Sequence, residues 1–348
     1  MDDTEKPRLH HTDYTVAWIC ALPIETAAAM AMLDNTHQEL PVSKNDKNSY
    51  TLGNIGAHNI VVVGLPAGVY GTTPAAIAAT HLTDTFQLIQ FSFMVGVGGG
   101  MPNIKPDIRL GDIVVSQPTE DIGGVVQYDR GRRLHRGHLN RTGSLNKPPE
   151  VLLKAMNKLQ ASHMLRESSI PDLLNKMVER WPKTKDIFKY PGDEQDLLFE
   201  NGYKHDESKD TCASCDRSKC VKRDPRSQHA SFIHYGIIGS GNEVIKDAAT
   251  RDKYAQKYSI LCFEMEAAGL MDHIPCLVIR GICDYADSHK NKQWQPYAAA
   301  RAAAYAKELL YIFHANVEGD TPASLDKSYN GLASPNKPSL SYKLNSKW

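Results

Sequence analysis

Short apolar runs typical of β-strands alternate with helix-forming segments along most of the chain, and this alternation limits the possible folds more than any other feature. Apolar strands that alternate with helices are typical of a layered sheet covered by helices. The sequence therefore predicts an α/β fold. Strands are expected at residues 14–20, 50–55, 59–64, 91–100, 111–116, 232–238, 259–263 and 276–282, and helices at 26–33, 74–82, 150–160, 171–181, 246–257, from 264 onward and at 295–314.

The alternation is interrupted between residues 129 and 230 by a basic loop, two predicted helices and a polar stretch that carries cysteines. Because the pattern resumes afterwards, we interpret 129–230 as an insertion or variable region within one domain that spans 14–317. Residues 1–13 are predicted to be an N-terminal extension. Residues 318–348 are rich in Ser, Pro, Asn and Lys without apolar periodicity, which is typical of a disordered tail.

The charged residues balance, with 40 Lys and Arg against 40 Asp and Glu, so the formal net charge at pH 7 is zero. A neutral chain has no general positive field that would hold a nucleic acid or an anionic membrane. No apolar run reaches the length of a membrane span, and the first 13 residues are polar, unlike a signal peptide. We therefore expect a cytoplasmic protein without nucleic acid or membrane as a partner.

Three of the seven cysteines lie in a polar stretch, as Cys212 and Cys215 in a C-x-x-C motif followed by Cys220. The other four lie inside apolar runs and are expected to be reduced core residues. With His205 and His229 nearby, the polar cysteines suggest either a structural zinc site or an ordinary polar loop. The stretch lacks a second C-x-x-C or an H-x-x-x-H motif, so the prediction is no metal, with zinc left open.

Acidic side chains follow two predicted strands at their carboxyl ends. Glu264, Met265 and Glu266 follow one strand, while Arg280 lies near the end of the next and Asp284 just after it. Ligands of open α/β sheets bind outside the carboxyl ends of the strands. Each acid also has an ordinary explanation, because carboxylates stabilise helix N-termini as dipole partners or caps. The coincidence of several such residues nevertheless favours a shared pocket.

These segments resemble the nucleoside phosphorylase/nucleosidase superfamily, which includes purine and uridine phosphorylases, methylthioadenosine/adenosylhomocysteine nucleosidases and AMP nucleosidases. The chain looks most similar to fungal domains of this kind that also occur at the N-terminus of receptor-type immune proteins, and to the methylthioadenosine/adenosylhomocysteine nucleosidases. The resemblance implies a three-layer α/β/α sandwich with a mixed twisted sheet, an enzyme without cofactor or metal, and a homo-oligomer. It rests on the motifs at 21–25, 96–100, 110–116, 239–245, 263–268 and 280–284.

The resemblance implies cleavage of the N-glycosidic bond of a purine nucleoside or nucleotide. Glu266 matches the residue that binds the ribose hydroxyls, with Met265 packed on the sugar, and Asp284 matches the acid that protonates N7 of the departing purine. Such a leaving group needs a proton, and the cationic sugar needs stabilising charge. The other matched cavity residues are Val97, Gly98, Thr72 and Asn242, together with Val244 and Ile245 beside the base.

The nucleophile is expected to be water. Phosphorylases of this superfamily carry a phosphate-binding arginine where this chain has Met94, whereas the nucleosidases carry a glutamate at the position of Glu25, which with Arg280 activates water. Val97 stands where bacterial nucleosidases have a serine that assists the water. Hydrolysis is therefore favoured, while inorganic phosphate as co-substrate and a catalytically silent nucleotide-sensing module stay as alternatives.

Residues 130–141 contain five arginines, two histidines and no acid. Such a run is often only a solvated loop. Its charge also suits the phosphates of a nucleotide substrate, and some immune-associated members of the superfamily remove the base from ATP. The candidate phosphate ligands are Arg130, Arg132, Arg133 and Arg136, with Arg223 and Arg226 as substitutes. Neither the base nor the phosphorylation state of the substrate is predicted.

Overall fold

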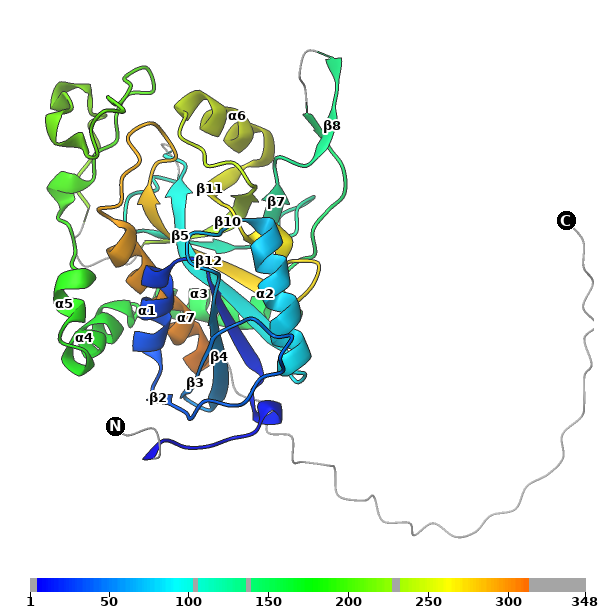
Figure 1. Ribbon diagram of the computed structural model, residues 1–348. Helices are drawn as coiled ribbons and strands as arrows, with labels where there is room; N and C mark the ends of the chain where they lie inside the picture. Colours follow the sequence, from blue (N-terminus) through cyan, green and yellow to red (C-terminus); the bar gives the residue numbers. More distant parts are fainter. Residues whose placement is uncertain (1–4, 103–105, 136–138, 227–231, 313–348) are drawn as a thin grey trace, which may run out of the picture. The chain divides into compact units, whose positions relative to one another are not determined.

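A computed structural model describes residues 5–102, 106–135, 139–226 and 232–312, and these residues form one compact unit (Figure 1). The side chains of Arg133 and Leu139 and the whole of the predicted tail at 318–348 lie outside the described part. The boundaries proposed from the sequence at 13, 129, 230 and 317 stay predictions. A search of the described helices finds none that is both long and apolar enough to cross a membrane.

A ten-stranded mixed sheet forms the centre of the molecule. The strand order is β11 (Ile260–Glu264), β10 (Ile233–Ser240), β6 (Ile113–Ser116), β12 (Cys276–Asp284), β5 (Phe91–Gly100), β1 (Val16–Cys20), β4 (His58–Gly64), β3 (Tyr50–Ile55) and β2 (Asn35–Thr36), while β7 (Val125–Gln127) pairs with β10. The inner strands β1, β4, β5 and β12 are mutually parallel, whereas β3 pairs antiparallel with β4 and β6 antiparallel with β12.

One half of the sheet closes on itself. The end of β5 pairs antiparallel with β11, where Gly99 faces Phe263 and Gly100 faces Cys262. Since β11 also pairs with β10, which continues through β6 and β12 back to β5, these five strands form a closed ring. The carboxyl ends of β5, β11 and β12 therefore meet at one place.

Helices cover both faces of the sheet (Figure 1). On one face, α1 (Pro23–Met32), α3 (Glu150–Leu165), α4 (Ile170–Arg180) and α7 (Gln295–Ile312) share a hydrophobic core with strand residues such as Trp18. On the other face, α2 (Thr72–Thr85) packs on the alternate strand residues, among them Ala17 and Ile19. Parallel strands are buried on both faces, and all of β1 is buried. The three-layer α/β/α sandwich is confirmed.

The helices α3 and α4 of the interrupted region contribute to this core. Their inward residues Leu152, Met156 and Leu173 pack in the same cluster as α7. The remaining helices are α5 (Thr184–Ile187), which follows α4, and α6 (Ala248–Tyr258), which precedes β11. Part of the predicted insertion thus forms part of the helical layer.

Two local expectations were wrong. The helix expected from Glu264 onward is only a short 3-10 turn at Ala267–Gly269, because the Glu264 carboxylate accepts hydrogen bonds from the amides of Glu266 and Ala267 and bends the chain tightly there. The basic loop is a β-hairpin, with β8 (Gly131–Arg133) antiparallel to β9 (Leu139–Arg141). In Figure 1, β8 projects beyond the main sheet.

Candidate active site

A cavity of about 550 Å³ opens at the carboxyl ends of β5, β11 and β12, beside the N-terminus of α1. A second cavity of about 1220 Å³ adjoins it, and residues such as Cys283 and Lys290 line both. The smaller cavity brings together seven of the site residues predicted from the sequence. These are Glu25, Val97, Gly98, Val244, Ile245, Met265 and Glu266.

Glu25 is held by backbone amides. Pro23 occupies the first turn of α1, so this helix begins earlier than expected and Glu25 lies in its first turn, where carboxylates are favoured. Its Oε2 accepts from the amides of Ala21 at 2.8 Å and Leu22 at 2.9 Å, and its Oε1 accepts from the amide of Val97 at 2.8 Å. Burial raises the pKa of Glu25, against the opposing charge of Arg280. The carboxylate is thus fixed at the cavity wall.

Arg280 lies behind the cavity, on β12, and is fully buried. Its Nη2 donates to Glu264 Oε2 and lies 3.4 Å from Glu266 Oε2. Burial disfavours the charge of Arg280, but Glu264, Glu266 and Glu25 together outweigh this and raise the pKa of the guanidinium. Within the described residues Arg280 makes no ion pair with Glu25, so its direct partners are the two glutamates of the β11 turn.

Glu266 is the buried carboxylate whose protonation changes near neutral pH. Burial raises its pKa to about 7, with Arg280 opposing the rise. A carboxylate accepts hydrogen bonds from two hydroxyls at once, whereas a protonated carboxyl loses part of this capacity.

If Glu266 binds the ribose hydroxyls, as the family resemblance implies, we expect the affinity for an uncleavable purine C-nucleoside to fall by up to about tenfold per pH unit below pH 7, since binding then requires release of one proton. Calorimetric titration between pH 5.5 and 8.5 measures this. The free purine base, which lacks the ribose hydroxyls, is the matched control, and an identical pH profile for base and nucleoside would contradict the assignment.

Asp284 ends β12 and lines the larger cavity. Its Oδ1 accepts from the amide of Ala286 at 2.9 Å, and its Oδ2 lies 2.9 Å from Lys290 Nζ and 3.2 Å from the thiol of Cys283. Ala286 has a positive φ of 51°, so the chain turns in an unusual direction just after this hydrogen bond. The carboxyl group is therefore oriented by the backbone and paired with one ammonium.

The glycine run at the end of β5 makes room for these charged groups. A Cβ on Gly96 would collide with Glu25 Oε1 and Arg280 Nη1, and a Cβ on Gly99 would lie 2.7 Å from Asp284 Oδ1. Such close approaches leave no space for a side chain. The motif at 96–100 is thus explained by the side chains that converge on it from α1 and β12.

Other predicted residues lie away from the cavity wall. Asn242 Oδ1 accepts from the amide and the hydroxyl of Thr72, at 3.1 and 3.0 Å, so these two residues bond to each other at the start of α2. Arg130 and Arg132 are exposed on or beside the β8–β9 hairpin and do not line the cavity. Arg136 and the side chain of Arg133 lie outside the described residues.

The sequence reasoning missed several residues of the cavity. Lys246, Lys290 and Lys292 line the place where the two cavities meet. Tyr70, which precedes α2, also lines the smaller cavity. Each belongs to a polar loop without periodicity, so no local pattern marks it. Lys290 follows Asp284 by six residues, and this closeness in the sequence is the one sign that it could lie near the site.

Comparison with known proteins gives several relatives, although no family model matches. The chain is 46% identical over 308 residues to a nucleotide-binding leucine-rich repeat (NLR)-like protein of Hyaloscypha variabilis, in a match that covers 88% of this chain and 30% of that protein. It is 22% identical to the ATP nucleosidase Cap17 of Escherichia coli, over 87% of this chain and 52% of Cap17. The chain thus spans less than a third of the first relative and about half of the second.

A full-length relative and two solved structures complete the comparison. The chain is 23% identical to the 5′-methylthioadenosine/S-adenosylhomocysteine nucleosidase of Mycobacterium bovis, over 86% of this chain and 96% of that enzyme. It superposes on the futalosine hydrolase of Helicobacter pylori with a TM-score of 0.53 and 15% identity, covering 86% of this chain and 99% of the other. For the 5′-methylthioadenosine/S-adenosylhomocysteine nucleosidase of S. pneumoniae the TM-score is 0.54 at 17% identity, covering 86% and 100%.

The predicted family resemblance is confirmed by the relatives and the fold. From β1 to α7, the chain is similar to proteins of the nucleoside phosphorylase/nucleosidase superfamily.

Proposed function

We propose that the chain hydrolyses the N-glycosidic bond of a purine nucleoside or nucleotide and releases the free base. The observation that carries this proposal is the convergence of three acids at adjoining cavities, Glu25 from α1, Glu266 after β11 and Asp284 from β12. All three are buried yet line a cavity wall, which suits groups that act on a bound molecule.

Asp284 is proposed to protonate the leaving group. A purine that departs as an anion is a poor leaving group, and protonation at N7 allows it to depart neutral. Asp284 takes up this proton from water and passes it to N7, while Lys290 Nζ, 2.9 Å from Asp284 Oδ2, holds the side chain in place. The electron pair of the C1′–N9 bond then leaves with the base.

Glu266 and Glu25 are proposed to act on the sugar and the water. Glu266 accepts the ribose hydroxyl hydrogen bonds with Met265 packed on the ring, while Glu25 receives the proton of the water that adds to C1′. Positive charge develops on the sugar as the bond breaks, and two nearby carboxylates stabilise it. Arg280 positions Glu266 through a direct contact of 3.4 Å and also holds the neighbouring Glu264.

Hydrolysis is favoured over phosphorolysis by the charge around the smaller cavity. Four glutamates line it, namely Glu25, Glu243, Glu264 and Glu266, and no arginine is among the described residues of its lining. A phosphate dianion beside these glutamates, away from the lysines of the lining, would meet repulsion and lack its usual bidentate partner. Met94, at the position of the phosphorylase arginine, is fully buried in the sheet.

A phosphorylated substrate is the finer part of the proposal. Lys246, Lys290 and Lys292 line the smaller cavity where it meets the larger one, and their positive charge suits phosphate groups. The relative Cap17 is an ATP nucleosidase. We propose that these lysines, and not the arginines of the β8–β9 hairpin, face the phosphates. A cytoplasmic location and a homo-oligomer stay predictions.

Incubation with adenosine, inosine, guanosine, methylthioadenosine, AMP and ATP tests the proposal, with chromatography of the released base and sugar. We expect free base and ribose or ribose phosphate without added phosphate. Sugar 1-phosphate formed only with added phosphate would instead support phosphorolysis, and no release from any substrate would support a silent sensing module.

If ATP is cleaved, Lys292→Ala is expected to raise KM for ATP by about tenfold, because one charge-assisted contact is worth about 1.4 kcal/mol or more. Arg132→Ala, on the hairpin, is the matched control with unchanged KM. A raised KM for ATP in Arg132→Ala, with an unchanged KM in Lys292→Ala, would instead indicate that the hairpin arginines bind the phosphates.

A further inference from the structure

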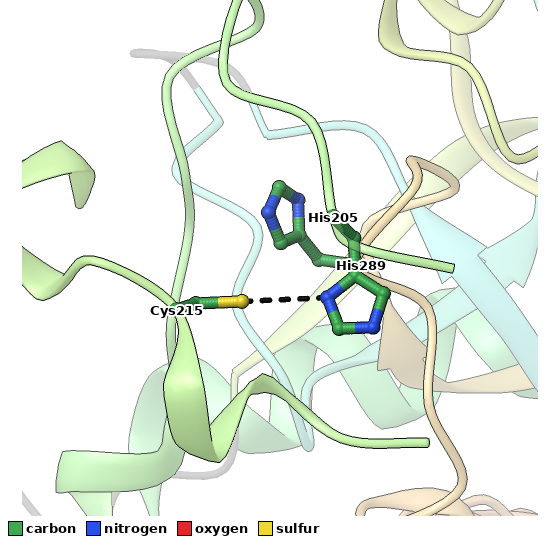
Figure 2. Close-up of side chains that lie close together, drawn as sticks. All are labelled: His205, Cys215 and His289. Carbon is green, nitrogen blue, oxygen red and sulfur yellow. Dashed lines mark hydrogen bonds between the residues drawn. The ribbon is translucent and has the colours of Figure 1, made fainter. Parts of the chain in front are cut away.

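Two histidines and two cysteines gather beside the catalytic cavity, where the cysteine segment, residues 205–220, packs on the loop after β12. One donor atom from each of His205, Cys215 and His289 lies within 4.8 Å of the others. Cys212 adds a fourth donor, since its Sγ lies 3.8 Å from His205 Nδ1. Figure 2 shows His205 and Cys215 on the green segment and His289 on the loop that approaches it.

Hydrogen bonds prepare His205 as a ligand. Its Nε2 lies 2.8 Å from the carbonyl oxygen of Lys209. Because a carbonyl only accepts, Nε2 carries the hydrogen of the neutral ring, and Nδ1 keeps its lone pair. That Nδ1 faces Cys215 Sγ at 3.3 Å, the contact drawn in Figure 2. Metal-bound histidines usually donate their other ring N–H to a carbonyl or carboxylate oxygen in this way.

His289 provides an independent sign of a missing partner. The residue is 7% exposed, and its Nε2 is buried without a hydrogen-bond partner among the described residues. The Phe199 ring stacks on the imidazole at 4.1 Å, which fixes the plane of the ring. A buried polar nitrogen without a partner is costly, and coordination of a cation would satisfy it.

We propose that His205, Cys212, Cys215 and His289 bind one Zn²⁺ in a tetrahedral structural site. Two thiolates and two imidazoles form a common zinc ligand set, and bond lengths of about 2.0–2.3 Å place neighbouring donors roughly 3.3–3.8 Å apart. The donor atoms of His205, Cys215 and His289, which lie within 4.8 Å of one another, need to approach by up to about 1–1.5 Å around the ion. This revises the sequence prediction of no metal.

The sequence could not identify this donor set, because His289 lies 74 residues beyond Cys215. Cys220 instead lies at an isolated bridge with Phe199. His229 falls outside the described residues. All seven cysteines are free thiols, so both members of the C-x-x-C motif remain available as ligands.

The proposed zinc would anchor the loop that carries Lys290. His289 is its neighbour in the chain, and Lys290 pairs with Asp284 at 2.9 Å. His205 also donates its amide to Ser288 Oγ at 3.1 Å, so the cysteine segment already contacts this loop. The metal would therefore act as a structural clamp next to the active site, without contact with the substrate.

Elemental analysis of the full chain, purified without a histidine tag and without chelators, tests the site. We expect about one Zn²⁺ per chain in the wild type and in Cys220→Ser, and less than about a tenth of that in Cys215→Ser and His289→Ala. A chelator should lower the Tm of the wild type but not that of Cys215→Ser, because a ligand that binds only the folded state stabilises it.

Cobalt gives a second measurement that does not depend on the folding of variants. Titration of chelator-treated wild-type protein with Co²⁺ should produce the intense visible bands of a tetrahedral ion together with a thiolate charge-transfer band. Absence of these bands and of bound zinc in the wild type would overturn the proposal. A Cys212–Cys215 disulfide in protein purified under reducing conditions, or equal zinc in wild type and Cys215→Ser, would overturn it as well.

Discussion

The Asp284→Asn variant is expected to lose about 10²- to 10⁴-fold in kcat on purine nucleosides, the usual contribution of a positioned general acid. The amide keeps the size of the side chain and its bond from Ala286, so the fold should persist, but it has no acidic proton to transfer to N7. Single-turnover release of the base, followed by chromatography, measures the loss.

A change of leaving group separates proton donation from other roles of Asp284. The leaving group of 4-nitrophenyl riboside, 4-nitrophenolate, departs without being protonated, so Asp284→Asn should cleave this substrate nearly as fast as the wild type does. A 7-deazapurine nucleoside lacks N7 and should be cleaved slowly by both proteins. Equal loss of activity on the nitrophenyl and purine substrates would show that Asp284 does not act as the acid.

Arg280→Met is expected to destabilise the fold by about 3–5 kcal/mol, the usual cost of removing one partner from a buried ion pair. Arg280 is fully buried, and Glu264 and Glu266 would lose the cation that compensates them. Urea denaturation at pH 8 measures this loss. Arg132→Met, at an exposed arginine, is the control and should change the free energy of unfolding by less than about 0.5 kcal/mol.

The loss in Arg280→Met should be smaller at pH 5.5 than at pH 8. Glu266 has a folded-state pKa of about 7 against an ordinary value of 4.5, so between these values the folded state binds more protons and its stability falls as pH rises. Without Arg280 the folded-state pKa of Glu266 rises further, which extends this fall to higher pH. A loss that is the same at both pH values would contradict the electrostatic explanation.

The strands of the central sheet could be predicted from local patterns of apolar residues and glycines in the sequence. The strand at 91–100 was predicted with the bounds of β5, because an apolar run that ends in glycines has few other stable environments. The closure of β5 onto β11 had no local signal, since it depends on antiparallel pairing between distant glycine and phenylalanine backbones. The prediction of a helix after Glu264 was wrong. The helix propensity of these residues is overridden by the hydrogen bonds that the Glu264 carboxylate accepts from the amides of Glu266 and Ala267.

The candidate site was predictable only where a motif carried it. Glu25, Met265 and Glu266 line the cavity, as the family resemblance implied, but Arg280 contacts Glu264 and Glu266 in place of Glu25. Lys290 was missed because a lysine in a polar loop is ordinary, and its contact with Asp284 arises only when the chain turns back through Ala286.

The closed ring of β5, β12, β6, β10 and β11 has a consequence for the order of folding. The β3–β4 hairpin joins neighbouring residues, whereas Gly99 and Phe263 lie roughly 160 residues apart in the chain. Long loops cost more entropy to close, and contacts between distant residues slow folding. We therefore expect the hairpin half to gain protection from hydrogen exchange first during refolding. The edge that carries the three acids would be completed last, so that newly made chains acquire substrate binding only when folding is nearly finished.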